Sequence, residues 1–159
     1  MTSHPLDQAI ARTRRFRVPV LSSTRRERLA ELYTGAAIAA TRPTVLELTV
    51  LAVRAAAWAS TVGVPDPWAA VRAEFDRAYA KHRGLTPLHS SMSDDDRAAI
   101  LLEEVGEVAR ACTPDARTEV GHAGDLAAEL VQVATMALTW AQAIINAQPA
   151  GEAGLGRGA

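Results

Sequence analysis

The sequence predicts an all-α protein with a single domain built as a five-helix bundle. Its 159 residues correspond to roughly one domain of ordinary size. Thirty-three residues are alanine, the strongest helix former, while aromatic residues make up only 4% of the chain. A β-sandwich or barrel is not expected, because its core requires β-branched and aromatic side chains. Cys112 is the single cysteine, which excludes an internal disulfide and a cysteine-rich metal cluster.

Five segments have helical periodicity and begin at residues typical of a helix start. Thr24 and Glu27 form a capping-box pattern, in which the hydroxyl and the carboxylate each bond a backbone amide of the first turn. Asp66 and Pro67 provide an N-cap and a first-turn proline, and Ser93 precedes three aspartates that suit the positive end of a helix dipole. The predicted helices cover residues 24–40, 44–63, 67–82, 93–112 and 122–146.

The chain is predicted to consist of an N-terminal arm, one helical domain and a C-terminal tail. The arm lacks helical periodicity and contains Pro19, which would interrupt a strand ladder, so we expect an extended conformation. The tail is rich in glycine and is expected to be disordered. The predicted boundaries are 1–22 for the Arg-rich arm, 23–148 for the domain and 149–159 for the tail, with a helix pair at 23–63 and a second helical part at 66–148.

The charge of the chain is close to neutral but unevenly distributed. The formal net charge is −1, whereas residues 1–30 carry +5 and residues 94–129 carry −7. The overall balance excludes a uniformly basic nucleic-acid-binding protein. The N-terminus lacks the order of a signal peptide, and charged residues interrupt the longest apolar run before it reaches the ~18 residues of a membrane span. We therefore expect a cytoplasmic protein that does not span a membrane.

Two of the predicted helices carry carboxylates that helical spacing places on common faces. Glu104 and Glu107 are three residues apart and Glu103 and Glu107 are four apart, so these side chains are neighbours. On the last helix, Asp125 and Glu129 also share a face. Antiparallel packing of the two helices would bring Glu104, Glu107, Glu129 and Asp125 into one pocket suited to a hard cation such as Mg²⁺. The alternative interpretation is an ordinary solvated acidic face that binds no ion.

Three sequence runs, FDRAYAKHRG, ILLEEVGEVARA and DLAAELVQVATMALTWAQAI, lie within residues 67–146. They resemble the MazG-like, all-α nucleoside triphosphate pyrophosphatases over about half of the chain. The family signature is EExxE followed after a spacer by ExxD. Glu103, Glu104 and Glu107 match its first part, and Glu129 matches the start of the second. Gln132 occupies the aspartate position, which replaces an anionic ligand by a neutral amide.

The resemblance implies a Mg²⁺-dependent hydrolase that cleaves a nucleoside triphosphate between the α- and β-phosphates, giving monophosphate and pyrophosphate. It also implies antiparallel helices, here preceded by an extra N-terminal helical hairpin, and a homodimer or larger homo-oligomer. Mg²⁺ is the expected cofactor, with Mn²⁺ as the alternative ion. The implied metal ligands are Glu104, Glu107 and Glu129, with Asp125 as a compensating acid. Glu103 is expected to act as the catalytic base or as a ligand of a second metal ion.

Four further residues are predicted to bind the nucleotide substrate. Lys81, the only lysine, ends the third predicted helix, and Arg97 lies one to two turns before the acids, so both are candidate phosphate ligands. For Lys81, a favourable interaction with the C-terminal end of the helix dipole is the favoured interpretation. Gln132 shares the face of Glu129, and Trp68 is a candidate for stacking on the base, with a core position as its alternative.

The Arg-rich arm supports a different functional class. In this alternative the chain is a catalytically weak or inactive MazG-like helical dimerisation module, and the arm binds nucleic acid or a partner protein. The arginines occur in short runs, so a solvated arm or a contact between subunits is favoured over nucleic acid.

One internal similarity suggests a degenerate duplication of a helix pair. Residues 47–59 and 129–141 match at six of 13 positions under a constant offset of 82. Glu47, Leu48 and Trp58 carry the similarity, because the other three matches are alanine. A duplication would place the two halves about a pseudo-two-fold axis. The alternative is chance agreement between two alanine-rich amphipathic helices.

Overall fold

The protein is all-α, as predicted. The computed structural model describes residues 3–17, 20–113 and 126–148, and this part of the chain contains six helices and no strand. The helices are α1 (Asp7–Thr13), α2 (Arg25–Thr41), α3 (Val45–Thr61), α4 (Pro67–Lys81), α5 (Asp94–Ala111) and α6 (Leu126–Ala147). The prediction of five helices was wrong by one, because residues 7–13 form a helix where an extended arm was expected.

Local hydrogen bonds set the starts of the helices as the sequence predicted. The Thr24 hydroxyl accepts from the Glu27 amide at 3.2 Å, and the Glu27 carboxylate accepts from the Thr24 amide at 3.2 Å. Ser93 and Asp96 make the same reciprocal pair at the start of α5. The Asp66 carboxylate accepts from the first amides of α4, directly before the first-turn proline. These bonds satisfy backbone amides that have no partner within their own helix.

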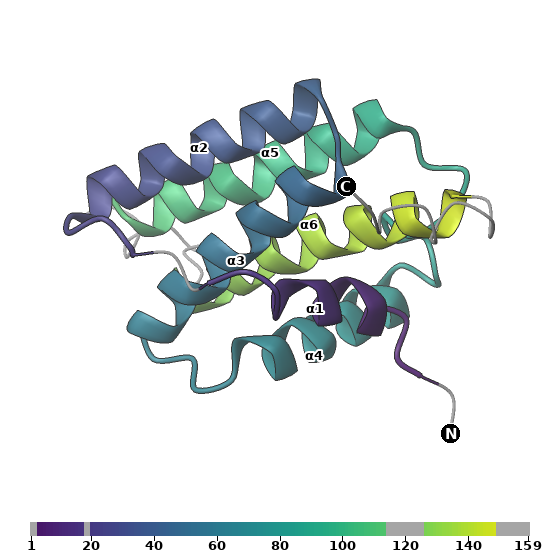
Figure 1. Cartoon of the computed structure of the whole chain (residues 1–159), viewed down its shortest axis with the longest axis horizontal. Coiled ribbons are helices and arrows are strands. Elements are labelled where there is room, and N and C mark those ends of the chain that lie inside the picture. The colour runs from purple at the N-terminus through teal and green to yellow at the C-terminus, as the bar shows by residue number, and fades with distance from the viewer. Residues whose placement is uncertain (1–2, 18–19, 114–125, 149–159) are drawn as a thin grey trace, which may run out of the picture.

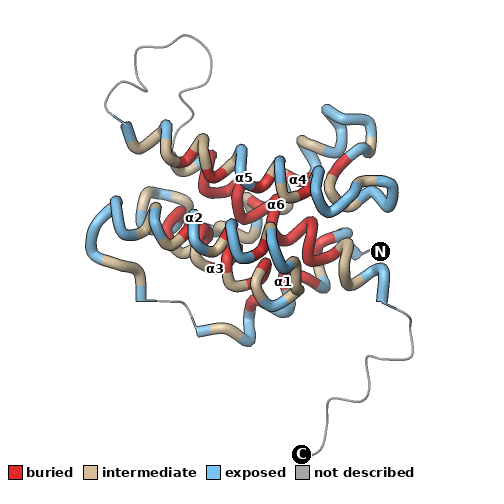
Figure 2. Tube along the Cα trace, turned by 90° about the horizontal axis from the view of Figure 1, so that it is seen from above, coloured by how far each residue is buried: buried red, intermediate tan, exposed pale blue. Residues whose placement is uncertain are grey.

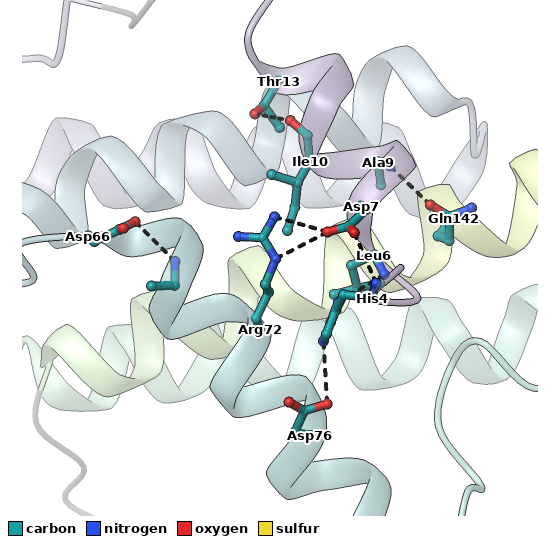
Figure 3. Close-up of polar contacts among 11 residues, drawn as sticks. His4, Leu6, Asp7, Ala9, Ile10, Thr13, Asp66, Arg72, Asp76 and Gln142 are labelled. Atoms are coloured by element: carbon teal, nitrogen blue, oxygen red, sulfur yellow. Dashed lines mark hydrogen bonds and ion pairs between the residues drawn. The ribbon is translucent and has the colours of Figure 1, made fainter. Parts of the chain in front are cut away.

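Helix α1 has no side-chain cap of its own and is held by the rest of the fold (Figure 3). Leu6, Ala9 and Ile10 are buried in the core. The Ala9 amide donates to Gln142 Oε1 of α6 at 2.9 Å, and Asp7 of α1 pairs with Arg72 of α4 at 3.0 Å. Burial of these three apolar side chains therefore stabilises a seven-residue helix that would not be stable alone.

The helices form two layers (Figures 1 and 2). One layer contains α2, α3 and α1 in that order, and the other contains α5, α6 and α4. Helix α3 packs against α6, and α2 packs against α5. Figure 2 shows the buried residues gathered between the layers. The indole of Trp140, late in α6, donates to Asp94 at the start of α5, so α5 and α6 are antiparallel.

Helix α6 forms the centre of the core. It packs against α1, α3, α4 and α5, and Leu130, Leu138 and Trp140 are fully buried. By length and composition alone α6 could cross a membrane, but 72% of its apolar window is buried inside the protein. This degree of burial is consistent with the core helix of a soluble protein.

A candidate acidic metal centre

Three carboxylates from two helices converge beside the core. Glu104 and Glu107 lie one turn apart on α5, and Glu129 lies in the first turn of α6. One oxygen from each carboxylate can be chosen so that all three lie within 4.8 Å of one another. The apolar stripes of α5 and α6 hold these side chains in place, because Val105 and Leu130, which directly follow Glu104 and Glu129, are fully buried, as is Leu101 one turn before Glu104. The acidic centre is defined here as Glu104, Glu107 and Glu129.

The acidic centre is electrostatically strained without a counter-ion. Burial, followed by the charges of the neighbouring carboxylates Glu107, Glu129, Glu103 and Glu74, raises the pKa of Glu104 to about 7. The Oε2 atom of Glu104 is buried without a hydrogen-bond partner in the described structure. A buried acceptor without a donor is costly, and a bound cation would satisfy it.

Glu129 experiences the same repulsion. Its residue surface is only 4% exposed, and burial together with a hydrogen bond and the charge of Glu107 raises its pKa to about 7. Glu74 raises this pKa as well, while Arg110 lowers it. Two carboxyl groups with raised pKa values at one place indicate that the centre binds either protons or a cation near neutral pH.

Helix α4 adds a charged pair that the sequence analysis missed. The charge of Glu74 raises the pKa of both Glu104 and Glu129. Arg77 donates to the Glu74 carboxylate through two nitrogens, at 2.7 and 2.6 Å. Glu74 and Glu104 both raise the pKa of Arg77. The signal in the sequence was weak, because an i,i+3 Glu–Arg pair is common on solvated helices. Only the packing of α4 on α6 shows which way this pair faces.

Gln132 lies beside the acidic centre as a hydrogen-bond donor. Its side-chain nitrogen donates to Glu129 Oε2 at 2.7 Å. The amide therefore stabilises one anionic oxygen of Glu129 and orients it. Asp125, the acid expected to compensate for Gln132, lies outside the described residues.

The converging group does not include the other described residues that were predicted for the site. Glu103 is exposed on α5 next to Glu104, and Lys81 is exposed at the end of α4. Trp68 packs partly buried against the core in the first turn of α4. Along their helices, Lys81 and Trp68 are each about 10 Å from Glu74 at 1.5 Å per residue.

Arg97 has a structural environment on α5. The residue is 9% exposed, and its guanidinium donates to the carbonyls of Pro87 and His89 and to Asp94. It lines a hollow of about 630 Å³ between the loop after α4 and the end of α6, which is distinct from the acidic centre. With these three bonds in place, Arg97 holds the loop instead of facing the carboxylates.

Fold and site together define an all-helical protein with a carboxylate centre suited to a hard, oxygen-preferring cation. Compared with known proteins, the chain matches no family model, no curated protein and no solved structure.

Proposed function

We propose that this protein is a Mg²⁺-dependent nucleoside triphosphate pyrophosphohydrolase of MazG-like type, with Mn²⁺ as an alternative ion. The single observation that carries the proposal is the convergence of Glu104, Glu107 and Glu129 around a buried, unpartnered carboxylate oxygen. A neutral or basic pocket would not suit a divalent cation, whereas three carboxylates in this arrangement do. The match of these residues to the EExxE and Exx pattern supports the choice of reaction.

The residues of the acidic centre and those beside it have separate roles in this proposal. Glu104, Glu107 and Glu129 hold the ion, and Gln132 keeps Glu129 oriented. A bound divalent ion would neutralise phosphate oxygens and lower the pKa of a water molecule. Attack of a water oxygen on the α-phosphorus, with cleavage of its bond to the bridging oxygen, would release pyrophosphate and leave a monophosphate. Glu103, exposed beside Glu104, accepts the proton of the water.

All described carboxylates of the acidic centre come from one chain. A homo-oligomer, as the resemblance implies, is therefore compatible with the proposal but is not needed to assemble the ligands. Two of the three cations on α4, Lys81 and Arg77, would supply phosphate ligands, Arg77 only after leaving Glu74. The third, Arg72, is paired with Asp7.

A nucleotide panel tests the proposal directly. Purified protein is incubated with each nucleoside triphosphate and Mg²⁺, and released pyrophosphate is measured for wild type, Glu107→Ala and the control Glu47→Ala on α3. We expect wild type and the control to release pyrophosphate at equal rates, and Glu107→Ala to lose at least 100-fold, an order of magnitude typical for loss of an essential electrostatic group. Equal background rates in all three proteins would remove the enzyme proposal.

The alternative, a module that binds nucleic acid or a partner through its arginines, is supported by one specific feature. Arg12, Arg14, Arg15, Arg25 and Arg26 are exposed, and within the described residues none makes an ion pair. Phosphate binding by such a surface depends steeply on salt. Two results together would favour this alternative. Wild type would be retained on DNA in a salt-sensitive way that is lost when these arginines are changed to glutamine, and it would release no pyrophosphate.

A further inference from the structure

The contacts between helices have a two-fold pattern, because exchanging three pairs of helices leaves the set of contacts unchanged. If α1 is exchanged with α4, α2 with α5 and α3 with α6, every principal helix contact becomes another contact that the structure contains. The α3–α6 and α2–α5 contacts map onto themselves, α2–α3 maps onto α5–α6, α1–α3 onto α4–α6, and α1–α6 onto α3–α4. The two layers in Figure 1 also follow the same spatial order, α2–α3–α1 and α5–α6–α4. This is the pattern of a two-fold axis within one chain.

The residues of α2 and α5 correspond at a constant offset of 69. Both helices begin with a capping box, formed by Thr24 and Glu27 in α2 and by equivalent residues in α5. The buried apolar positions of α2 also have buried apolar partners in α5: Leu32 with Leu101, Ala36 with Val105, and Ala39 with Val108. One exposed apolar pair corresponds as well, since Tyr33 is 42% exposed and Leu102 is 41% exposed.

One polar arrangement also occurs twice. Arg28 and Arg97 are the fourth residues of α2 and α5, and each donates its Nε to a carbonyl of the preceding loop, Ser22 and Pro87 respectively. Arg28 lies over the ring of Trp58 of α3 at 6.0 Å. In the other half, the equivalent Trp140 of α6 donates to Asp94, which also binds Arg97. The repeated arginine therefore fastens a loop to a tryptophan on the central helix in each half.

The acidic centre occurs in only one half. Under the offsets of 69 and 82, Glu104 corresponds to Gly35, Glu107 to Ile38, and Glu129 to Glu47. A Cβ atom placed on Gly35 would lie 3.1 Å from Leu51 Cδ1, so in the N-terminal half Leu51 fills the space at the position equivalent to Glu104. Glu47 alone cannot form a carboxylate cluster with glycine and isoleucine.

We infer that the chain is a fused pseudo-dimer in which one of two equivalent centres has been kept, so each chain binds metal at one centre built entirely from its own residues. The inference rests on the proposed metal centre for its stoichiometry, and on the duplicated packing for the equivalence of the halves. Beyond the proposed activity, each chain then has one metal centre, and the half of the chain that contains α5 and α6 supplies it.

Metal binding to the full chain tests the stoichiometry. Mn²⁺ is titrated into wild type, Glu107→Gln and Glu47→Gln, and bound ion is measured by calorimetry and electron paramagnetic resonance. We expect Glu107→Gln to lose all specific binding and Glu47→Gln to keep the wild-type stoichiometry. Mixing Glu107→Gln with Glu129→Gln chains should restore nothing. Loss of half of the binding in Glu47→Gln, or recovery on mixing, would overturn the inference.

A second readout does not depend on metal. Amide hydrogen exchange is compared in wild type, Arg28→Ala and Arg97→Ala without divalent ions. We expect Arg28→Ala to speed exchange several-fold in the loop at 20–23, and Arg97→Ala to do so in the loop at 85–92. If only Arg97→Ala has such an effect, the two arginines are not equivalent and the pseudo-dimer is refuted. If Mn²⁺ does not bind at all while both loops respond, the proposed function fails and the duplicated architecture stands.

Discussion

Replacing Glu104 by glutamine removes one negative charge from the acidic centre and keeps the size of the side chain. In the metal-free protein, burial raises the pKa of this carboxyl from the ordinary 4.5 to about 7. Each pKa unit corresponds to about 1.4 kcal/mol, so full ionisation at pH 8 costs roughly 3 kcal/mol. Solvent reaching the partly exposed side chain reduces this cost to about 2 kcal/mol.

We therefore expect Glu104→Gln to increase the free energy of unfolding by about 2 kcal/mol at pH 8 in EDTA. With a urea m-value of about 2 kcal/mol/M, the midpoint of unfolding moves up by about 1 M. The difference should shrink as the pH falls from 7 and disappear well below pH 4.5, because the carboxyl is then protonated in the native and the unfolded state alike. Saturating Mg²⁺, at about 100 times its Kd, should stabilise wild type by roughly 2.7 kcal/mol and leave the variant nearly unchanged.

Glu103→Gln is the matched control, since Glu103 is the adjacent residue on α5 and is exposed. Its free energy of unfolding should stay within about 0.5 kcal/mol of wild type. An equal gain in both variants would show that general surface charge, and not burial at the acidic centre, limits stability. Unchanged stability of Glu104→Gln at pH 8 would refute the strain assigned to this carboxyl.

Three further predictions follow from the same structure. Without divalent ions, wild-type stability should fall between pH 5 and 8, because Glu104 and Glu129 hold protons in the native state that the unfolded chain has lost; a thermal midpoint that rises over this window contradicts their raised pKa values. Gln142→Ala leaves the buried Ala9 amide unpaired and should lower the free energy of unfolding by about 1–3 kcal/mol, measured by chemical denaturation. Amide hydrogen exchange should become faster in α1 alone, and an unchanged midpoint of denaturation argues against this contact. Gln132→Asp should cost about 1.5–3 kcal/mol without metal, because it removes the bond to Glu129, yet tighten Mg²⁺ binding in calorimetry; weaker binding would exclude this position as a ligand.

The sequence allowed prediction of those features that local interactions decide. Helix starts at Thr24, Asp66 and Ser93 depend on hydrogen bonds to amides two or three residues away, and all three are present. The cluster of Glu104 and Glu107 follows from helical spacing alone. Helix α1 was missed because its stability comes from burial against helices far away in the chain, which no local pattern reports.

The missed and misplaced site residues have the same explanation. Glu74 and Arg77 face the acidic centre only because α4 packs on α6, and this packing is a tertiary contact. Arg97 was predicted as a phosphate ligand from its distance along the helix, yet its guanidinium is occupied by loop carbonyls. Spacing along one helix predicts which residues share a face, whereas contacts between helices decide what that face meets.

The central position of α6 has a consequence for biosynthesis. This helix contacts α1, α3, α4 and α5, yet it is the last of the described helices to be synthesised. At about 5–20 residues per second, several seconds pass between the appearance of α1 and that of α6. During this time α1, α3, α4 and α5 lack the helix that all four contact, and the Ala9 amide lacks its partner Gln142. Folding of this protein should therefore be completed only after residues 126–147 leave the ribosome, and chaperones that bind apolar helix faces have a defined interval in which to act.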